Sequence, residues 1–139
     1  MKEESSQNTI LIAEDSPPNR KILGHLLKKM GFDVIECEDG QKAWETHLQS
    51  GTENNLIAII SDVMMPNMDG LDLLTKVRES EKYNKIPFLL ITAVSDKEYI
   101  FKAKSLTVNG YILKPITYER LVQKLKELFP QREFPKIAS

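Results

Sequence analysis

Short apolar runs alternate with amphipathic segments along most of the chain, and this alternation restricts the fold more than any other feature of the sequence. Apolar runs of roughly 4–8 residues are typical of buried strands, and the segments between them repeat apolar residues with helical spacing. A regular order of strand and helix favours a parallel sheet with helices on both faces. The predicted strands span residues 9–15, 32–37, 56–62, 87–93 and 110–114.

The polarity of each predicted strand indicates its place in the sheet. The first, third and fourth strands are apolar almost throughout, as expected of central strands, whereas the second alternates and suits an edge. Five strands and five helices within 139 residues predict a single α/β domain. We expect a doubly wound (βα)5 three-layer sandwich with the parallel strand order 2-1-3-4-5.

Residues typical of helix ends place the helices and the domain limits. Ser16 is the predicted N-cap of the first helix, Pro17 its first residue and Gly31 its end. The other helices are predicted around residues 40–50, after Asp69 and Gly70, from a capping box of Ser95 and Glu98, and from the cap Thr117 to Pro130. The predicted domain organisation is a flexible N-terminal segment at residues 1–8, a folded domain at 9–129 and a loose C-terminal tail at 130–139.

The composition excludes several functional classes. A net charge of −1 gives no general attraction to nucleic acid or to membrane surfaces. The lone Cys37 cannot form an internal disulfide and suits a reducing cytosol. The N-terminus is acidic and polar, unlike a signal peptide, and no apolar run reaches the ~18–20 residues of a membrane span. We therefore expect a cytoplasmic protein without direct nucleic-acid binding or membrane insertion.

Polar residues stand at the carboxyl ends of four predicted strands. Glu14 and Asp15 end the first strand, Asp62 the third, Thr92 the fourth and Lys114 the fifth. In open α/β sheets, ligands bind beyond these ends, close to the point where the strand order reverses. In the order 2-1-3-4-5 that point lies between the first and third strands, so the three carboxylates are expected in one pocket.

Three carboxylates at close range repel one another, and a hard divalent cation removes this conflict. Mg²⁺ prefers one or two carboxylates together with water and phosphate oxygens, so the pocket is a predicted Mg²⁺ site, with Mn²⁺ as the alternative ion. Lys114 offers a positive charge and Thr92 a hydroxyl for the oxygens of a phosphoryl group. In such a site Asp62 can act as a nucleophile and become an aspartyl phosphate.

Four motifs carry a family resemblance: "LIAEDSPPNR", "IISDVMMPNMDG", "LLITA" and "GYILKP". Together they resemble the response-regulator receiver domains of two-component signalling, and the chain is similar to the stand-alone chemotaxis type from about residue 9 to 129. The resemblance implies a flavodoxin-like fold and makes Asp62 the phosphoacceptor. It also implies that Glu14 and Asp15 hold Mg²⁺ directly or through water. The backbone carbonyl of Met64 is implied as a further metal ligand.

The same resemblance assigns the remaining site residues. Thr92, Lys114 and the backbone N–H of Ala93 are implied to contact the phosphoryl oxygens. Tyr111 matches the aromatic side chain that changes rotamer together with the threonine. The Lys114–Pro115 peptide bond is implied to be cis, which is uncommon even before proline.

The resemblance implies a signalling switch rather than a conventional enzyme. A partner histidine kinase or phosphotransfer protein would donate the phosphoryl group of a phosphohistidine to Asp62 in a Mg²⁺-dependent transfer. The chain would promote its own phosphorylation and dephosphorylation. The face formed by the fourth helix, fifth strand and fifth helix would then change and control the binding of a downstream protein target. Phosphorylation-dependent dimerisation is left open.

One departure from the family concerns the turn after the fourth helix. Where the family usually has a Gly-Ala pair, the chain has Thr107 and Val108. Because left-handed backbone geometry is costly for threonine, Asn109 and Gly110 are expected to make the bend.

Two residues near the site and two histidines elsewhere also receive an interpretation. Met64 and Val94 are expected to flank the pocket and to restrict attacking water, which predicts slow self-hydrolysis of the phosphorylated state. His25 and His47 are interpreted as ordinary surface histidines rather than phosphodonors.

Two other functions would use the same pocket. A Mg²⁺-dependent phosphatase of the haloacid-dehalogenase type usually has a second Asp two residues after the nucleophile as general acid. Met64 stands in that position and disfavours turnover of phosphate esters. A constitutive interaction module would keep the pocket without using it, but every polar group expected of a working site is present.

Overall fold

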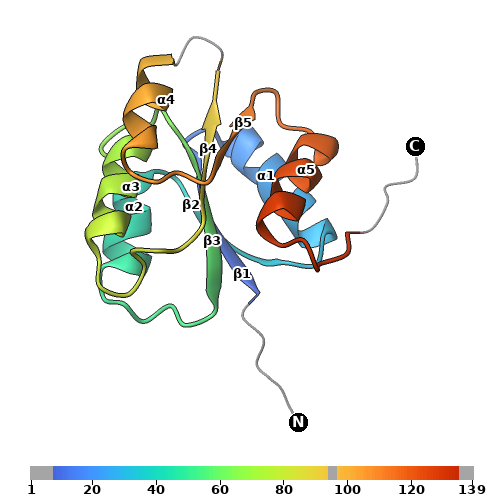
Figure 1. Ribbon diagram of the computed structural model, residues 1–139, viewed down its shortest axis with the longest axis horizontal. Coiled ribbons are helices and arrows are strands. Elements are labelled where there is room, and N and C mark those ends of the chain that lie inside the picture. The colour runs from blue at the N-terminus through green and yellow to red at the C-terminus, as the bar shows by residue number, and fades with distance from the viewer. Residues whose placement is uncertain (1–7, 94–96, 135–139) are drawn as a thin grey trace.

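The computed structural model describes residues 8–93 and 97–134, and it has five parallel strands in the order β2-β1-β3-β4-β5 (Figure 1). The strands are β1 (Thr9–Ala13), β2 (Asp33–Cys37), β3 (Leu56–Asp62), β4 (Phe88–Thr92) and β5 (Gly110–Leu113). The predicted strand order is confirmed, with β2 at one edge and β1, β3 and β4 in the centre.

Helices cover both faces of the sheet, as predicted. They are α1 (Pro17–Lys29), α2 (Gly40–Lys42), which continues as the π-helical segment η1 (Ala43–Leu48), α3 (Gly70–Glu79), α4 (Lys97–Lys104) and α5 (Tyr118–Leu128). In Figure 1, α1 and α5 lie on one face of the sheet, and α2, α3 and α4 lie on the other. No helix within the described residues is long and apolar enough to cross a membrane.

Short polar side chains cap these helices. Ser16, Asp69 and Thr117 each accept a hydrogen bond from the backbone N–H three residues further along, as N-caps do. Asp39 caps α2 in the same way, through the N–H of Lys42. The predicted capping residue Ser95 of α4 lies outside the described residues.

The sheet separates two apolar clusters. Successive residues of a strand point to opposite faces, so Leu11 packs in the cluster that includes α3, whereas Ile10 and Ile12 pack in the cluster that includes α1 and α5. All three side chains are fully buried. Burial stabilises each by roughly 1.5–3 kcal/mol, which is why a central strand must be apolar on both faces.

The described part of the C-terminal tail packs on the domain, contrary to the expectation that it is loose. The guanidinium carbon of Arg132 lies 4.0 Å from the centre of the Phe32 ring, and the ring of Phe134 lies 6.1 Å from the same ring. Arg132 also donates a hydrogen bond to the side-chain oxygen of Asn8. The tail contributes to the burial of Phe32, which is 3% exposed.

Arg132→Ala is expected to lower the free energy of unfolding by about 1–2 kcal/mol, because the stacking on Phe32 and the hydrogen bond to Asn8 are lost together. Urea denaturation followed by circular dichroism measures the change. The control is Gln131→Ala at the neighbouring exposed position, which should have no effect. Equal stability of both variants and the wild type would show that the tail contributes nothing.

The turn between α4 and β5 differs from the prediction. Thr107, and not Asn109 or Gly110, has the left-handed conformation, with φ at 58°. The guanidinium of Arg78 donates to the carbonyl oxygens of Leu106 and Thr107 at 2.9 and 2.8 Å. The side-chain oxygen of Asn109 also accepts from Arg78 and from the backbone N–H of Phe88. These contacts fix Asn109 beside β4, so the chain reverses two residues earlier, at Thr107.

Thr107→Gly is expected to raise the free energy of unfolding by about 0.5–1 kcal/mol, because glycine adopts a positive φ without the steric cost of a β-branched side chain. Thr107→Ala keeps the Cβ atom and should gain less. Chemical denaturation of the two variants separates these cases. A destabilised glycine variant would mean that the Thr107 side chain makes a compensating contact.

Candidate functional site

The carboxyl ends of β1, β3 and β5 bring together the charged residues that the sequence indicates. Carboxylate oxygens of Glu14, Asp15 and Asp62 lie within 4.8 Å of one another. The ammonium Nζ of Lys114 donates a hydrogen bond to Asp62 Oδ2 at 2.9 Å, although the two residues are 52 positions apart in the sequence. Three acidic groups and one cation therefore share one end of the sheet.

The register of the strands explains this meeting. β1 and β3 pair in parallel with Ala13 opposite Ser61, so the residues that follow, Glu14 and Asp62, lie next to each other. On the far side of β3, the last residue of β4, Thr92, pairs with Leu113 of β5, which directly precedes Lys114. A parallel sheet in the order 2-1-3-4-5 is thus enough to bring these strand ends together.

The three carboxylates differ in their surroundings. Glu14 and Asp62 are only 1% and 2% exposed, whereas Asp15 is exposed. Glu14 Oε2 accepts a hydrogen bond from the backbone N–H of Ser16 at 2.9 Å. Glu14 Oε1 is buried and has no hydrogen-bond partner among the described residues. An unpaired buried oxygen costs roughly 1–3 kcal/mol. A bound ligand that contacts this atom would remove that cost.

Burial and charge change the pKa values within the site. Burial is the main cause that raises the pKa of Glu14 to about 7; the Ser16 N–H opposes the rise, and the nearby Asp62 adds to it. Burial lowers the pKa of Lys114, but its hydrogen bond to Asp62 and the surrounding carboxylates outweigh this effect, so that its pKa is raised. One lysine thus faces three acidic groups, and negative charge remains in excess.

The donor set fits a hard divalent cation. Three oxygen donors converge, one of them buried without a partner, and Mg²⁺ favours such carboxylate sites that leave room for water and phosphate oxygens. Mn²⁺ has the same preference for oxygen ligands. The side chain of Met64, in the loop after β3, is 51% exposed. The role of its backbone carbonyl as a metal ligand stays a prediction.

In the presence of a chelator, the stability of the protein is expected to fall as the pH rises from about 5 to about 8. The folded-state pKa of Glu14, about 7, lies above its ordinary value of 4.5. Between these two pH values the folded chain keeps a proton on Glu14 that the unfolded chain has released. The resulting contribution to the free energy of unfolding is fully present below pH 4.5 and is lost as the pH rises through about 7. The expected loss is on the order of 2 kcal/mol.

Thermal denaturation across this pH range measures the effect, with Glu14→Gln as the matched variant. The variant should lose most of the pH dependence, and Mg²⁺ added to the wild type at the upper pH should restore stability. A wild-type slope equal to that of the variant would contradict the assignment to Glu14.

The other predicted site residues lie on β4 and β5 and on the segments that follow them. Thr92 is fully buried, and its hydroxyl donates to the carbonyl oxygen of Ala93 at 3.0 Å. The hydroxyl of the half-buried Tyr111 donates to the carbonyl oxygen of Ile100 in α4 at 3.0 Å. The Lys114–Pro115 peptide bond is cis, as the resemblance implies. Val94 lies outside the described residues.

Two residues that support Glu14 were not indicated by the sequence. Ser16 was predicted only as a helix cap, but its N–H also holds the Glu14 carboxylate. Arg20, one turn into α1, donates from Nη1 to the carbonyl oxygen of Glu14 at 2.8 Å. The short distance in sequence between Glu14 and the start of α1 was the feature that could have indicated these contacts.

The two histidines lie in different environments. His25 is exposed, as predicted. His47 is half-buried, and its Nδ1 lies 3.0 Å from Glu53 Oε2, a contact that the sequence did not indicate. That neither histidine is a phosphodonor stays a prediction. Glu53 belongs to the connection that enters β3, at the end of the sheet opposite to the acidic cluster.

The comparisons with known proteins all point to one protein family. The sequence profile of the response regulator receiver domain matches residues 10–126. The chain is 37% identical over 118 residues to the chemotaxis protein CheY1 of Helicobacter pylori, covering 84% of this chain and 93% of that protein. It is also 37% identical over 121 residues to the chemotaxis protein CheY of Pseudomonas aeruginosa, covering 86% and 94%.

Solved structures have the same fold. The chemotaxis protein CheY4 of Vibrio cholerae superimposes with a TM-score of 0.78 at 29% sequence identity, covering 88% of this chain and 98% of that chain. A putative response regulator from Chloroflexus aurantiacus superimposes with a TM-score of 0.78 at 28% identity, covering 91% and 100%.

Proposed function

The chain belongs to the response regulator receiver domain family, and from this premise we propose that it is a signalling switch activated by phosphorylation of Asp62. The observation that carries the proposal is the position of the Asp62 carboxylate. It is 2% exposed, lies within 4.8 Å of the two other acidic side chains and accepts a hydrogen bond from Lys114. A nucleophile held in place by a cation beside a metal-binding set is the arrangement that phosphoryl transfer requires.

The transfer is a displacement at phosphorus. A partner histidine kinase or phosphotransfer protein presents a phosphohistidine, an oxygen of Asp62 forms the new P–O bond, and the P–N bond breaks to release neutral imidazole after protonation. Lys114 holds the attacking carboxylate by a hydrogen bond, and its positive charge then stabilises the negative charge on the phosphoryl oxygens. A bound Mg²⁺ supplies further positive charge, and Glu14 and Asp15 are the residues proposed to hold it together with Asp62 and the Met64 carbonyl.

The switch connects the site to α4 through two hydroxyl groups. Thr92 gives up its hydrogen bond to Ala93 and turns toward the phosphoryl group, which the Ala93 N–H also contacts. Tyr111 gives up its hydrogen bond to the Ile100 carbonyl, 3.0 Å long in the present state, and moves inward. Because that bond ties β5 to α4, its loss shifts the equilibrium between two arrangements of this face.

A downstream protein in the cytoplasm reads the face formed by α4, β5 and α5. Phe101 of α4 is 78% exposed and Leu113 of β5 is 44% exposed, so this face offers apolar side chains to a partner. Phosphorylation biases which arrangement the partner meets, and a dimer formed on this face is an alternative outcome of the same change.

Intact-mass spectrometry with a small phosphodonor tests the proposal. Wild-type protein incubated with phosphoramidate and Mg²⁺ should gain the mass of one phosphoryl group, and a chelator should prevent the gain. An unchanged mass under both conditions would overturn the proposed function.

Amide NMR with beryllofluoride, a phosphoryl mimic, tests the switch separately. Resonances of Thr92, Tyr111 and α4 should move, whereas resonances of the Arg132 and Phe32 contact at the other end of the domain should not. Absence of movement in α4 would favour a constitutive interaction module.

A further inference from the structure

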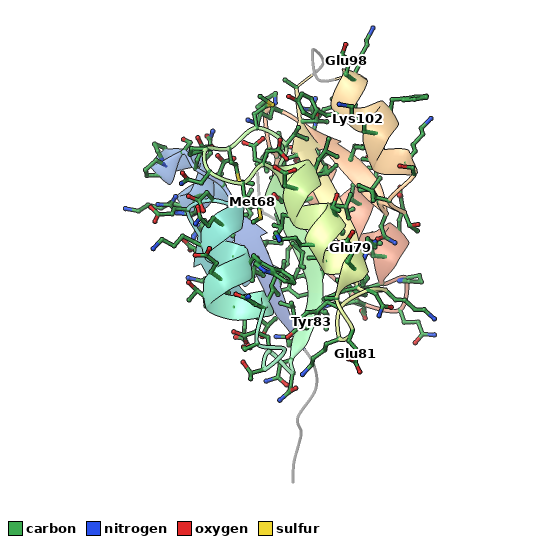
Figure 2. All side chains as sticks on the ribbon, turned by 90° about the vertical axis from the view of Figure 1, so that its left-hand side faces the viewer. Met68, Glu79, Glu81, Tyr83, Glu98 and Lys102 are labelled. Atoms are coloured by element: carbon green, nitrogen blue, oxygen red, sulfur yellow. The ribbon has the colours of Figure 1, made fainter. Side chains whose placement is uncertain are left out.

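The N-terminus of α2 is attached to the loop that follows Asp62. Asp39, 4% exposed, accepts a hydrogen bond from the Lys42 N–H at Oδ1 and another from the Asn67 side chain at Oδ2, both 2.8 Å long. The next residue, Gly40, donates its N–H to the carbonyl oxygen of Met68 at 3.2 Å. Figure 2 shows Met68 beside the upper end of α2, on the side toward α3. We call these side-chain and backbone contacts between residues 39–40 and 67–68 the α2 strap.

The strap is closely fitted. A Cβ atom on Gly40 would lie 2.5 Å from the Met68 carbonyl oxygen, so only glycine permits this approach. Asn67 has φ at 69°, a conformation that asparagine tolerates better than most residues. The other end of the loop is also fixed, because Gly70 donates its N–H to the Val63 carbonyl oxygen at 2.8 Å. The loop that carries Met64 is therefore held at both ends.

Capping of α2 does not explain the second hydrogen bond of Asp39. An N-cap needs one acceptor oxygen, and serine or asparagine provides it as well as aspartate. The other carboxylate oxygen is buried and used for Asn67, which lies in a different element. A hollow of about 410 Å³ is lined by Asp39, Asn67 and also Asp15 of the acidic cluster, so the strap and the candidate metal ligands border one recess.

We propose that Asp39 is a positioning residue for the metal and phosphoryl site, acting through Asn67 on the loop that carries the Met64 carbonyl. The inference rests on the proposed function, because it takes the residues after Asp62 as part of the Mg²⁺ site. Residues behind metal ligands keep those ligands in the geometry the metal needs, and their loss typically weakens binding by roughly 10–100-fold. Asp39 takes this supporting role without touching the metal or the phosphoryl group.

Two substitutions remove the side-chain hydrogen bond of the strap and keep its backbone bond between Gly40 and Met68. Asn67→Gly removes only the side-chain hydrogen bond, since glycine adopts a positive φ readily. Asp39→Ser keeps an N-cap oxygen for α2 but cannot also reach Asn67. Isothermal titration calorimetry with Mg²⁺ should give about tenfold weaker binding for each variant. The double variant should bind like either single variant, because both substitutions remove the same bond.

Stability and a distant control separate positioning from simple destabilisation. Arg132→Ala, which loosens the opposite end of the domain, should bind Mg²⁺ like the wild type. Strap variants that are less stable but bind Mg²⁺ normally, or that weaken binding additively, would overturn the role of Asp39 and leave the proposed function intact. A wild-type protein that binds no Mg²⁺ would overturn both.

Discussion

The Asp62→Asn variant is expected to take up a phosphoryl group from phosphoramidate at least about 100-fold more slowly than the wild type. The amide of asparagine is not an anionic nucleophile, and Lys114 loses the carboxylate oxygen that lies 2.9 Å from its ammonium group. Intact-mass spectrometry over time, at saturating Mg²⁺, measures the difference. Asp72→Asn is the matched control, since Asp72 is an exposed carboxylate in the first turn of α3.

Unfolding is not expected to explain this loss. The Asp62 charge contributes to the raised pKa of Glu14, which means that the two carboxylates repel each other in the folded state. Replacing Asp62 by a neutral side chain removes this repulsion, which offsets the loss of the ion pair with Lys114. Asp62→Asn should therefore be about as stable as the wild type in urea. Phosphorylation of the variant at the wild-type rate would show that a residue other than Asp62 accepts the phosphoryl group.

The arrangement of the site could be predicted because it depends on few choices. Apolar runs identify strands, and the polarity of each run indicates whether it is central. Parallel strands place all their carboxyl ends at one edge, so Glu14 and Asp62 had to meet once the strand order was correct. The ion pair that the structure shows between Asp62 and Lys114 follows from the same topology.

Features that depend on contacts between distant side chains were not predictable in this way. The left-handed turn at Thr107 is imposed by Arg78, 29 residues earlier, and local propensity alone favours a turn at Asn109 and Gly110. The packing of the tail needs Arg132 to meet Asn8, 124 residues earlier. No periodicity or turn pattern reports such a contact, because each partner alone is an ordinary polar surface residue.

Two helical glycines show the same difference between local and tertiary causes. Gly24 lies inside α1 and Gly70 is the first residue of α3, and in a helix interior alanine is intrinsically better than glycine by up to about 1 kcal/mol. Propensity alone therefore favours alanine at Gly24 and gives no warning against it at Gly70. The surroundings are different: a Cβ atom on Gly24 would lie 2.5 Å from Glu36 Oε2, at the free end of an exposed side chain, whereas one on Gly70 would lie 2.3 Å from the backbone carbonyl oxygen of Asp62.

Gly70→Ala is expected to lower the free energy of unfolding by about 2–3 kcal/mol, because neither β3 nor the start of α3 can move away without breaking core packing. Gly24→Ala should be neutral or slightly stabilising, since the Glu36 side chain can rotate into solvent. Urea denaturation of the two variants provides the comparison. Because the clash in Gly70→Ala falls on the backbone of Asp62, the proposed phosphoacceptor and metal ligand, the Mg²⁺ affinity of this variant should fall as well. The Mg²⁺ affinity of Gly24→Ala should stay unchanged. A Gly70→Ala variant as stable as the wild type would mean that the contact between α3 and the end of β3 is looser than the structure indicates.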